Sequence, residues 1–221
     1  MNCNDYQKIG KEDPFMLSKS NILKLWSLTI SAIIIMAAVT LSPAPGYAKN
    51  YIVYPTDDVS IWGGPPPGKD TSIRLYACHD SALGDCHIYI KFDLSSLAIP
   101  ADEKITRYTL KLFSDDMRPP EGVDVQLFAI ADNNWTTSSI TWDNKPAQGP
   151  LLATTHALAT WDQWLVSSAG LPTTGQISFL LFSINGEGAI FHSNENDTNR
   201  PYLVVSTGGV GTGIYSLLLW D

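Results

Sequence analysis

The sequence is poor in basic residues and in cysteine. It has 14 Lys and Arg against 22 Asp and Glu, and it contains three cysteines in 221 residues. The excess of acidic groups disfavours nucleic acid and anionic membranes as partners, because both are themselves negatively charged. So few cysteines exclude a dense disulfide framework, and a chain of this length can bury a hydrophobic core instead.

Catalytic signatures are also missing. The chain has no Gly-x-Ser-x-Gly elbow, no His-Glu-x-x-His motif and no phosphate-binding glycine loop. The four histidines stand at positions 79, 87, 156 and 192, without a motif partner. Asp115, Asp116 and Glu121 surround a proline-rich turn, a pattern typical of a solvated loop. The sequence therefore predicts no catalytic residues and no enzyme.

Residues 1–48 have the order of a Sec-type signal peptide. Lys19 and Lys24 precede an uncharged run over residues 25–41, and Pro43 and Pro45 follow it before a small-residue cleavage point at Ala48. An uncleaved anchor is the alternative, because the run is near the lower limit of about 17–25 residues for a spanning helix. The prolines favour cleavage. We therefore expect a secreted, cell-surface or periplasmic protein without stable membrane insertion after cleavage.

The remaining residues, 49–221, suit one domain of ordinary size. They carry 10 basic and 19 acidic residues, so the acidic balance persists without the leader. We expect the domain over residues 49–207. Residues 208–221 read as a glycine-rich joint and a short apolar tail, which is too short to cross a bilayer.

Short alternating segments predict β-strands rather than helices. Ile88, Ile90 and Phe92 alternate with polar or amphipathic residues, which is the period of a strand with one buried face. Asn185-Gly186 between two apolar runs predicts a hairpin turn. Around eleven such segments with frequent turns predict an all-β antiparallel sandwich or barrel. The expected strands cover residues 51–54, 72–77, 87–93, 105–113, 123–131, 139–142, 151–155, 163–166, 176–184, 189–192 and 202–207.

Two cysteines remain after the leader, and they have two interpretations. Cys78 and Cys86 favour a local disulfide, because disulfides persist in exported proteins. Zinc binding by these two thiolates with His79 and His87 is the alternative. Adjacent Cys and His side chains point to opposite faces of an extended chain, which disfavours a four-ligand zinc site.

Three stretches of the chain together resemble one known family. They are YIKFDLSSL at 89–97 with ITRYTLKL at 105–112, then WTTSSITWDNKP at 135–146, and finally FHSNE at 191–195 with NRPYLVV at 199–205. In this order they resemble the DNRLRE-domain family, which overlaps carbohydrate-binding module family 96 and the disaggregatase-related domains. The resemblance covers most of residues 52–206.

The resemblance implies a jelly-roll-like β-sandwich on exported and surface proteins, often beside polysaccharide-degrading domains. Some members bind acidic polysaccharides such as alginate through a basic cluster. The matching region here holds Lys69, Arg74 and Lys91, which are therefore candidate ligand-binding residues. Aspartates lie among these three in the sequence, which gives weight to neutral glycans or protein partners.

Tryptophans are candidates for stacking on sugar rings, because an aromatic face offers a large contact area. The mature part of the chain offers Trp62, Trp135, Trp142, Trp161 and Trp164. Core packing is the alternative for each, and it is favoured for Trp142 inside an Ile-Thr-Trp run. Trp135 follows two asparagines and Trp62 precedes a Gly/Pro loop, so these two are the preferred exposed ligand-binding candidates.

Acidic residues suggest a calcium site and an ion pair. Asp57 and Asp58 beside the first strand, with Glu195, are candidate calcium ligands, although no complete set of about 6–8 oxygens can be deduced. Calcium is accordingly the expected cofactor, if any. Glu195 and Arg200 flank the last loop and are expected to form a structural ion pair.

The sequence as a whole thus predicts an exported, non-catalytic protein that resembles a carbohydrate-binding module. Its expected partner is an extracellular polysaccharide or a cell-surface glycan. The alternative is a structural or adhesive surface protein of the same fold, with protein partners.

Overall fold

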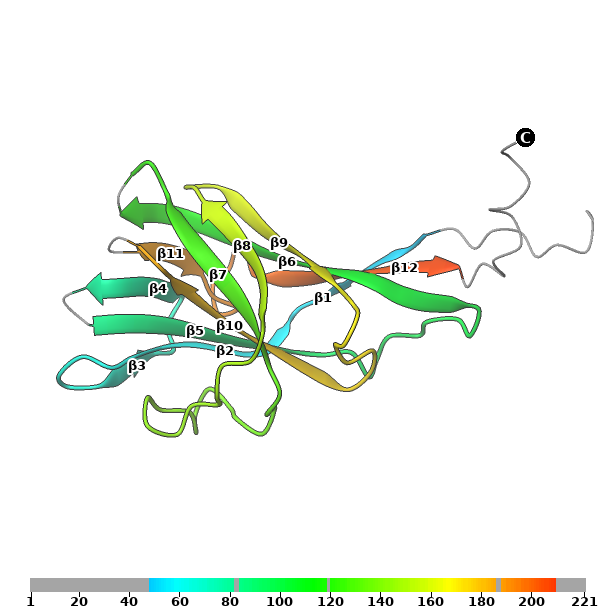
Figure 1. Ribbon diagram of the computed structural model, residues 1–221, viewed down its shortest axis with the longest axis horizontal. Helices are drawn as coiled ribbons and strands as arrows, with labels where there is room; N and C mark the ends of the chain where they lie inside the picture. The colour runs from blue at the N-terminus through cyan, green and yellow to red at the C-terminus, as the bar shows by residue number, and fades with distance from the viewer. Residues whose placement is uncertain (1–47, 82–83, 119, 186–187, 210–221) are drawn as a thin grey trace, which may run out of the picture. The chain divides into compact units, whose positions relative to one another are not determined.

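The computed structural model describes residues 48–81, 84–118, 120–185 and 188–209, and within these ranges the chain forms strands and no helix (Figure 1). The strands, in chain order, are β1 (Asn50–Val53), β2 (Pro55–Trp62), β3 (Gly68–Asp70), β4 (Arg74–Ser81), β5 (Gly84–Asp93), β6 (Glu103–Arg118), β7 (Val123–Ile130), β8 (Leu151–Ala157), β9 (Trp161–Ser167), β10 (Gln176–Ser183), β11 (Gly188–His192) and β12 (Tyr202–Gly209).

The strands form two antiparallel layers. One layer has the order β3-β2-β5-β10-β7-β8, and the other has the order β9-β6-β12-β1. β6 is long enough to serve two neighbours on one side, because β12 pairs with its first part and β11 with its end. β4 pairs with β11 and meets β5 at Cys78 and Cys86, which joins the layers at one side. The expected all-β antiparallel sandwich is confirmed.

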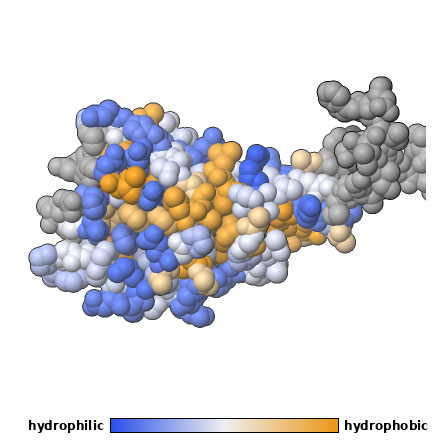
Figure 2. Space-filling model, in the orientation of Figure 1, coloured by the Kyte–Doolittle hydropathy of each residue, from blue (hydrophilic) through white to orange (hydrophobic). Residues whose placement is uncertain are grey.

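The main core lies between the two layers. Alternate residues of β5, β10 and β7 contribute one side of it, and alternate residues of β6, β9 and β12 contribute the other. Phe179 on β10, Trp164 on β9 and Tyr108 on β6 are among its largest buried side chains. On the outside, Figure 2 shows that apolar surface lies mostly along the middle of the viewed face, with hydrophilic surface around it.

A second core lies on the outer face of the β2-β5-β10-β7 layer. Residues 131–150, between β7 and β8, run across this face and lie below β2 and β5 in Figure 1. Trp135 and Ile140 of this connection pack with Tyr89 of β5 and Leu180 of β10. The connection therefore covers a sheet face that would otherwise be open to solvent.

The strand predictions differ from the structure at four places. Residues 139–142 are not a strand, because they form turns within the connection that covers the second core. No strand was predicted at β2, because its paired acids Asp57 and Asp58 hide the alternation of Val59 and Ile61. The short strand β3 was not predicted either, because it directly follows the Gly/Pro loop. The predicted hairpin at Asn185 is wrong, because β10 pairs with β5 and β7 whereas β11 pairs with β4 and β6.

The expected leader and tail, residues 1–47 and 210–221, lie outside the described residues, as does Gly186 of the predicted turn. Within the described part of the chain, no helix is long and apolar enough to cross a membrane.

Candidate functional site

The outer face of the β9-β6-β12-β1 layer presents aligned rows of side chains. The strand register places Ile52, Val204, Thr109 and Leu165 in one row across all four strands. The next row joins Tyr202, Lys111 and Gln163. Residues two apart on a strand share a face, so Trp161 on β9 extends the same surface. We call this surface the outer-face site.

An aromatic pocket lies at one end of the outer-face site. It has a volume of about 510 Å³ and is lined by Tyr54, Trp161, Asp197, Asn199, Arg200 and Tyr202. Trp161 and Tyr202 meet edge to face, with ring centroids 5.3 Å apart. Phe113 supports Trp161 from β6 at 5.5 Å. Tyr54, directly after β1, is 57 % exposed.

The loop between β11 and β12 brings polar groups to this pocket. Asn199 has a φ of 55°, a left-handed conformation that asparagine tolerates better than most residues. Arg200 donates from Nε to the Asn196 carbonyl at 3.0 Å, which fixes the guanidinium plane. Its terminal amino groups make no hydrogen bond to the described residues. Aromatic faces can stack on a sugar ring while a guanidinium group beside them donates hydrogen bonds to its oxygens.

The outer-face site is locally basic although the chain is acidic. Arg107 and Lys111 lie two positions on either side of Thr109 on β6, and Arg200 lies at the pocket. These three cations form no ion pair with another residue in the described ranges. Asp197 is the acidic residue among those that line the pocket.

The preferred stacking residue of the sequence analysis is not exposed. The side chain of Trp135 is 5 % exposed and belongs to the second core. Its Nε1–H donates to Ser178 Oγ at 3.2 Å, and its ring packs edge to face on Tyr89 at 5.8 Å. The prediction that Trp135 faces solvent is therefore wrong, because the 131–150 connection folds back on the sheet. Trp142 packs partly buried against the same cluster, as its core interpretation expected.

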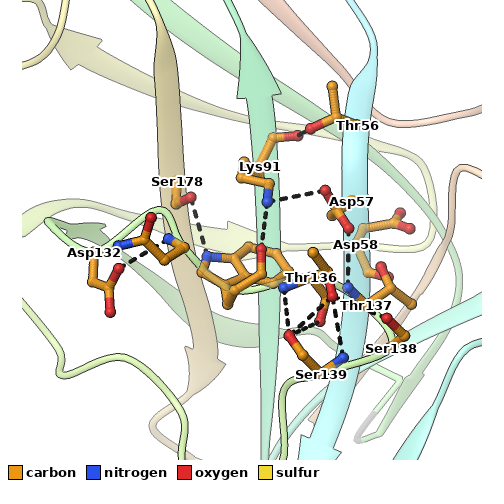
Figure 3. A network of polar contacts seen from close by, with 12 residues as sticks. Thr56, Asp57, Asp58, Lys91, Asp132, Thr136, Thr137, Ser138, Ser139 and Ser178 are labelled. Carbon is orange, nitrogen blue, oxygen red and sulfur yellow. Dashed lines mark hydrogen bonds and ion pairs between the residues drawn. The ribbon is translucent and has the colours of Figure 1, made fainter.

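Lys91 is part of the buried network that holds this connection in place (Figure 3). Its Nζ lies 3.0 Å from Asp57 Oδ2, donates to the Trp135 carbonyl and lies 4.8 Å from the centre of the Trp135 ring. Asp57 Oδ1 in turn accepts from the Thr137 N–H at 3.0 Å. With 3 % exposure, Lys91 serves the fold and is not placed to meet a ligand.

The other predicted ligand residues are dispersed. Lys69 donates to the carbonyls of Thr137 and Ser138 at 3.0 and 2.7 Å, which also anchors the 131–150 connection. Trp62 and Lys69 both line a separate depression of about 390 Å³ beside Pro65, Pro66 and Pro67. The Trp62 ring packs so closely on Gly68 that an added Cβ there would lie 2.4 Å from it. Arg74 is exposed at the start of β4. The structure thus brings Trp62 and Lys69 together at one depression, whereas Arg74, Lys91 and Trp135 lie elsewhere.

The predicted calcium ligands are divided between two faces of β2. Asp57 faces the 131–150 connection and is paired with Lys91, whereas Asp58 points to the opposite face, as neighbours on a strand do. Burial contributes most to raising the pKa of Asp58, and Glu195 lies close enough for its carboxyl to raise that pKa further. The expected Glu195–Arg200 ion pair is absent among the described residues, because Arg200 binds the Asn196 carbonyl instead.

The local disulfide is confirmed. Cys78 and Cys86 are bonded to each other across the β4–β5 pair, eight residues apart in the sequence. The zinc alternative is excluded for these two thiols, since both sulfur atoms are in the disulfide. His79 pairs with Asp85 at 2.9 Å, and His87 packs between aromatic rings.

Sequence reasoning identified part of the outer-face site. Trp161 was among the candidate stacking residues. Tyr54, Tyr202 and the cations Arg107 and Lys111 were not among the candidate ligand-binding residues. The two cations could have been found from the alternation of β6. There Arg107, Lys111 and Phe113 alternate with the buried residues Tyr108, Leu110 and Leu112. Which strands lie beside β6 is not readable from that alternation.

Residues 68–207 match carbohydrate-binding module family 96, and the chain belongs to that family. A gellan lyase from a Bacillus species is 30 % identical over 135 residues. That match covers 55 % of this chain and 5 % of the lyase, so the chain spans a small part of that relative.

Carbohydrate-binding modules are also among the solved structures that align with the chain. A xylan-binding module of family CBM15 is 10 % identical, with a TM-score of 0.36, and the match covers 71 % of this chain and 97 % of that one. The C-terminal CBM6 of a laminarinase from Zobellia galactanivorans is 9 % identical, with a TM-score of 0.30, over 71 % of this chain and 99 % of that one.

Proposed function

We propose that the chain is an exported, non-catalytic protein that binds extracellular polysaccharide on its outer-face site. The observation that carries this proposal is the aromatic pocket, where Trp161, Tyr202 and Tyr54 surround the free donor groups of Arg200. Aromatic side chains contribute contact area at low entropic cost, and fixed polar groups add orientation. Membership of a carbohydrate-binding family supports the same ligand class.

The charges of the site favour an acidic polysaccharide. Arg107, Lys111 and Arg200 are unpaired within the described ranges and lie on one face of a chain that is otherwise acidic. A carboxylated glycan would be attracted to this face and repelled by the rest of the surface. Of the three cations predicted from the sequence, Lys69 and Lys91 hold the 131–150 connection, and Arg74 is exposed at the start of β4.

The test is a glycan array probed with the full chain, with and without calcium, beside the variants Trp161→Ala and Trp62→Ala. We expect selective binding that falls at least about tenfold in Trp161→Ala, which corresponds to about 1.4 kcal/mol. Trp62→Ala is the matched control, because it removes a half-exposed tryptophan from a different depression. Equal loss in both variants, or loss in Trp62→Ala alone, would place the site elsewhere.

A structural or adhesive role with protein partners is the second candidate. The row beside the pocket favours it, because Ile52 and Leu165 at its two ends are 59 % and 51 % exposed, with Val204 next to Ile52. Exposed apolar rows of this kind mark protein contacts as well as ligand grooves. A folded sample that binds no glycan on the array would favour this role over the first.

A further inference from the structure

Acceptor oxygens without donors gather between β2 and the loop that follows β11. Asp58 is 2 % exposed, and its Oδ1 has no hydrogen-bond partner. The buried Oδ1 of Asn194 also has none. The exposed carboxyl of Glu195 lies close to Asp58, and its negative charge acts on that group. Buried acceptors are normally satisfied, so an unsatisfied group of this kind requires an explanation.

The backbone holds these oxygens together. The Asn194 N–H donates to Asp58 Oδ2 at 2.8 Å, which fixes the loop directly beside the Asp58 carboxyl. Ser193 anchors the same loop through its N–H to the Ile73 carbonyl at 3.0 Å and its Oγ to the Ser72 carbonyl at 2.7 Å. The two Ser193 contacts therefore hold the loop in place whatever the charge state of Asp58 or Glu195.

The nearby charges do not neutralise the two carboxyls. Lys91 lies on the other face of β2, where Asp57 pairs with it at 3.0 Å. Asp58 is buried and Glu195 lies close to it, so two carboxyl groups meet here with no basic side chain between them in the described part of the chain. A proton shared by the two carboxyls would relieve their repulsion, but it would leave the Asn194 oxygen without a partner. A cation satisfies carboxylate and amide oxygens together.

We infer that Asp58, Asn194 and Glu195 form the protein part of a calcium site that ties β2 to the loop between β11 and β12. Calcium is coordinated by carboxylate and amide oxygens at about 2.3–2.6 Å. Backbone carbonyls and water complete its shell of about 6–8 ligands. The three oxygen-bearing side chains replace the set expected from the sequence, in which Asp57 took the place that Asn194 takes here. The inference does not depend on the proposed glycan site.

The test is calcium binding by the full chain after treatment with a chelator. Isothermal titration and thermal unfolding are measured for the wild type, Asp58→Asn, Glu195→Gln and the control Asp102→Asn. Asp102 is an exposed carboxyl in the turn before β6. We expect calcium to bind the wild type with a dissociation constant of about 10⁻⁴–10⁻³ M, the range of extracellular modules, and to raise its Tm. Binding should weaken at least about tenfold in both site variants and stay unchanged in Asp102→Asn.

Two results would overturn the inference. The first is a wild type that binds no calcium at 10 mM, with a Tm that rises only when the pH is lowered, since that pattern means a shared proton. The second is undiminished binding in Glu195→Gln, whose exposed position should leave the fold intact even if Asp58→Asn unfolds. Glycan binding measured on the same samples separates this outcome from failure of the proposed function.

Discussion

Two tryptophans illustrate how local placement decides the role of a side chain in this sandwich. Trp161 starts β9 on its outward face, supported from behind by Phe113 and flanked by Tyr202. Trp135 lies in a polar connection with no strand pattern, yet it is buried because the connection folds onto an apolar sheet face. Flanking asparagines predicted exposure, but they describe only the neighbouring residues and not the surface onto which the connection folds.

Replacement of Trp135 by alanine should destabilise the fold without changing the ligand site. The variant loses a buried ring, its hydrogen bond to Ser178 and its contact with Lys91. We expect the free energy of unfolding to fall by about 3–5 kcal/mol, the usual cost of deleting a buried aromatic side chain. Urea denaturation measures this cost, with Trp62→Ala as the less buried comparison. A stable Trp135→Ala protein that has lost glycan binding would contradict this assignment.

His87 makes stability depend on pH. Its ring lies between Trp142 and Phe182, with centroids 4.8 and 5.0 Å away. Burial, reinforced by the charge of Lys145, lowers the pKa of His87 to about 4. The unfolded chain binds a proton near pH 6.5 and the folded protein does not. The contribution of the neutral ring is therefore complete above pH 6.5 and is lost as the pH falls toward 4.

The measurement is the free energy of unfolding at pH 7.5 and pH 4.5 for the wild type and His87→Phe. We expect the wild type to lose about 2–3 kcal/mol more than the variant between these two values. Asp162, whose pKa burial raises to about 6, acts in the opposite direction, but it is present in both proteins and cancels in the difference. Equal losses would show that His87 is protonated in the fold.

At the scale of elements, strands with a clear period of two were predictable, and elements defined by distant partners were not. β5, β7 and β10 alternate or run apolar, so their positions were close to those expected. β2 was not predicted because its two acids are stabilised by groups far away in the sequence. Lys91 pairs with Asp57, and the Asn194 N–H donates to Asp58. The apolar runs around Asn185 predicted a hairpin, but they could not show that each run belongs to a different layer.

The disulfide between β4 and β5 should contribute measurably to the free energy of unfolding. Because it closes a short loop between two strands, the chain-entropy relation gives about 2–3 kcal/mol for its removal. The double variant Cys78→Ala/Cys86→Ala, compared with the wild type by urea denaturation, tests this estimate. Reductant should lower the stability of the wild type and leave the double variant unchanged. If the double variant were as stable as the wild type, β4 and β5 would be held by their other contacts alone.

At the scale of the whole molecule, the resemblance predicted the family and the sandwich, and both are confirmed by the match over residues 68–207 and by the two strand layers. The binding surface was less predictable, because net charge is a sum over the chain. An excess of acids conceals three cations on one face, and only the pairing of β6 with β12 and β9 brings Lys111, Tyr202 and Gln163 into one row. Export and cleavage after Ala48 stay predictions of the leader sequence.

The most direct test of the outer-face site is the dissociation constant of a carboxylated polysaccharide, measured by isothermal titration for the wild type and for Trp161→Ala/Arg200→Ala. The account predicts binding that the double substitution weakens by at least about a hundredfold, or about 2.7 kcal/mol, with unfolding free energies that stay within about 1 kcal/mol, as for partly exposed sites. It also predicts that wild-type binding weakens as salt is raised. Unchanged binding in the folded double variant would contradict the assignment of this face as the ligand site.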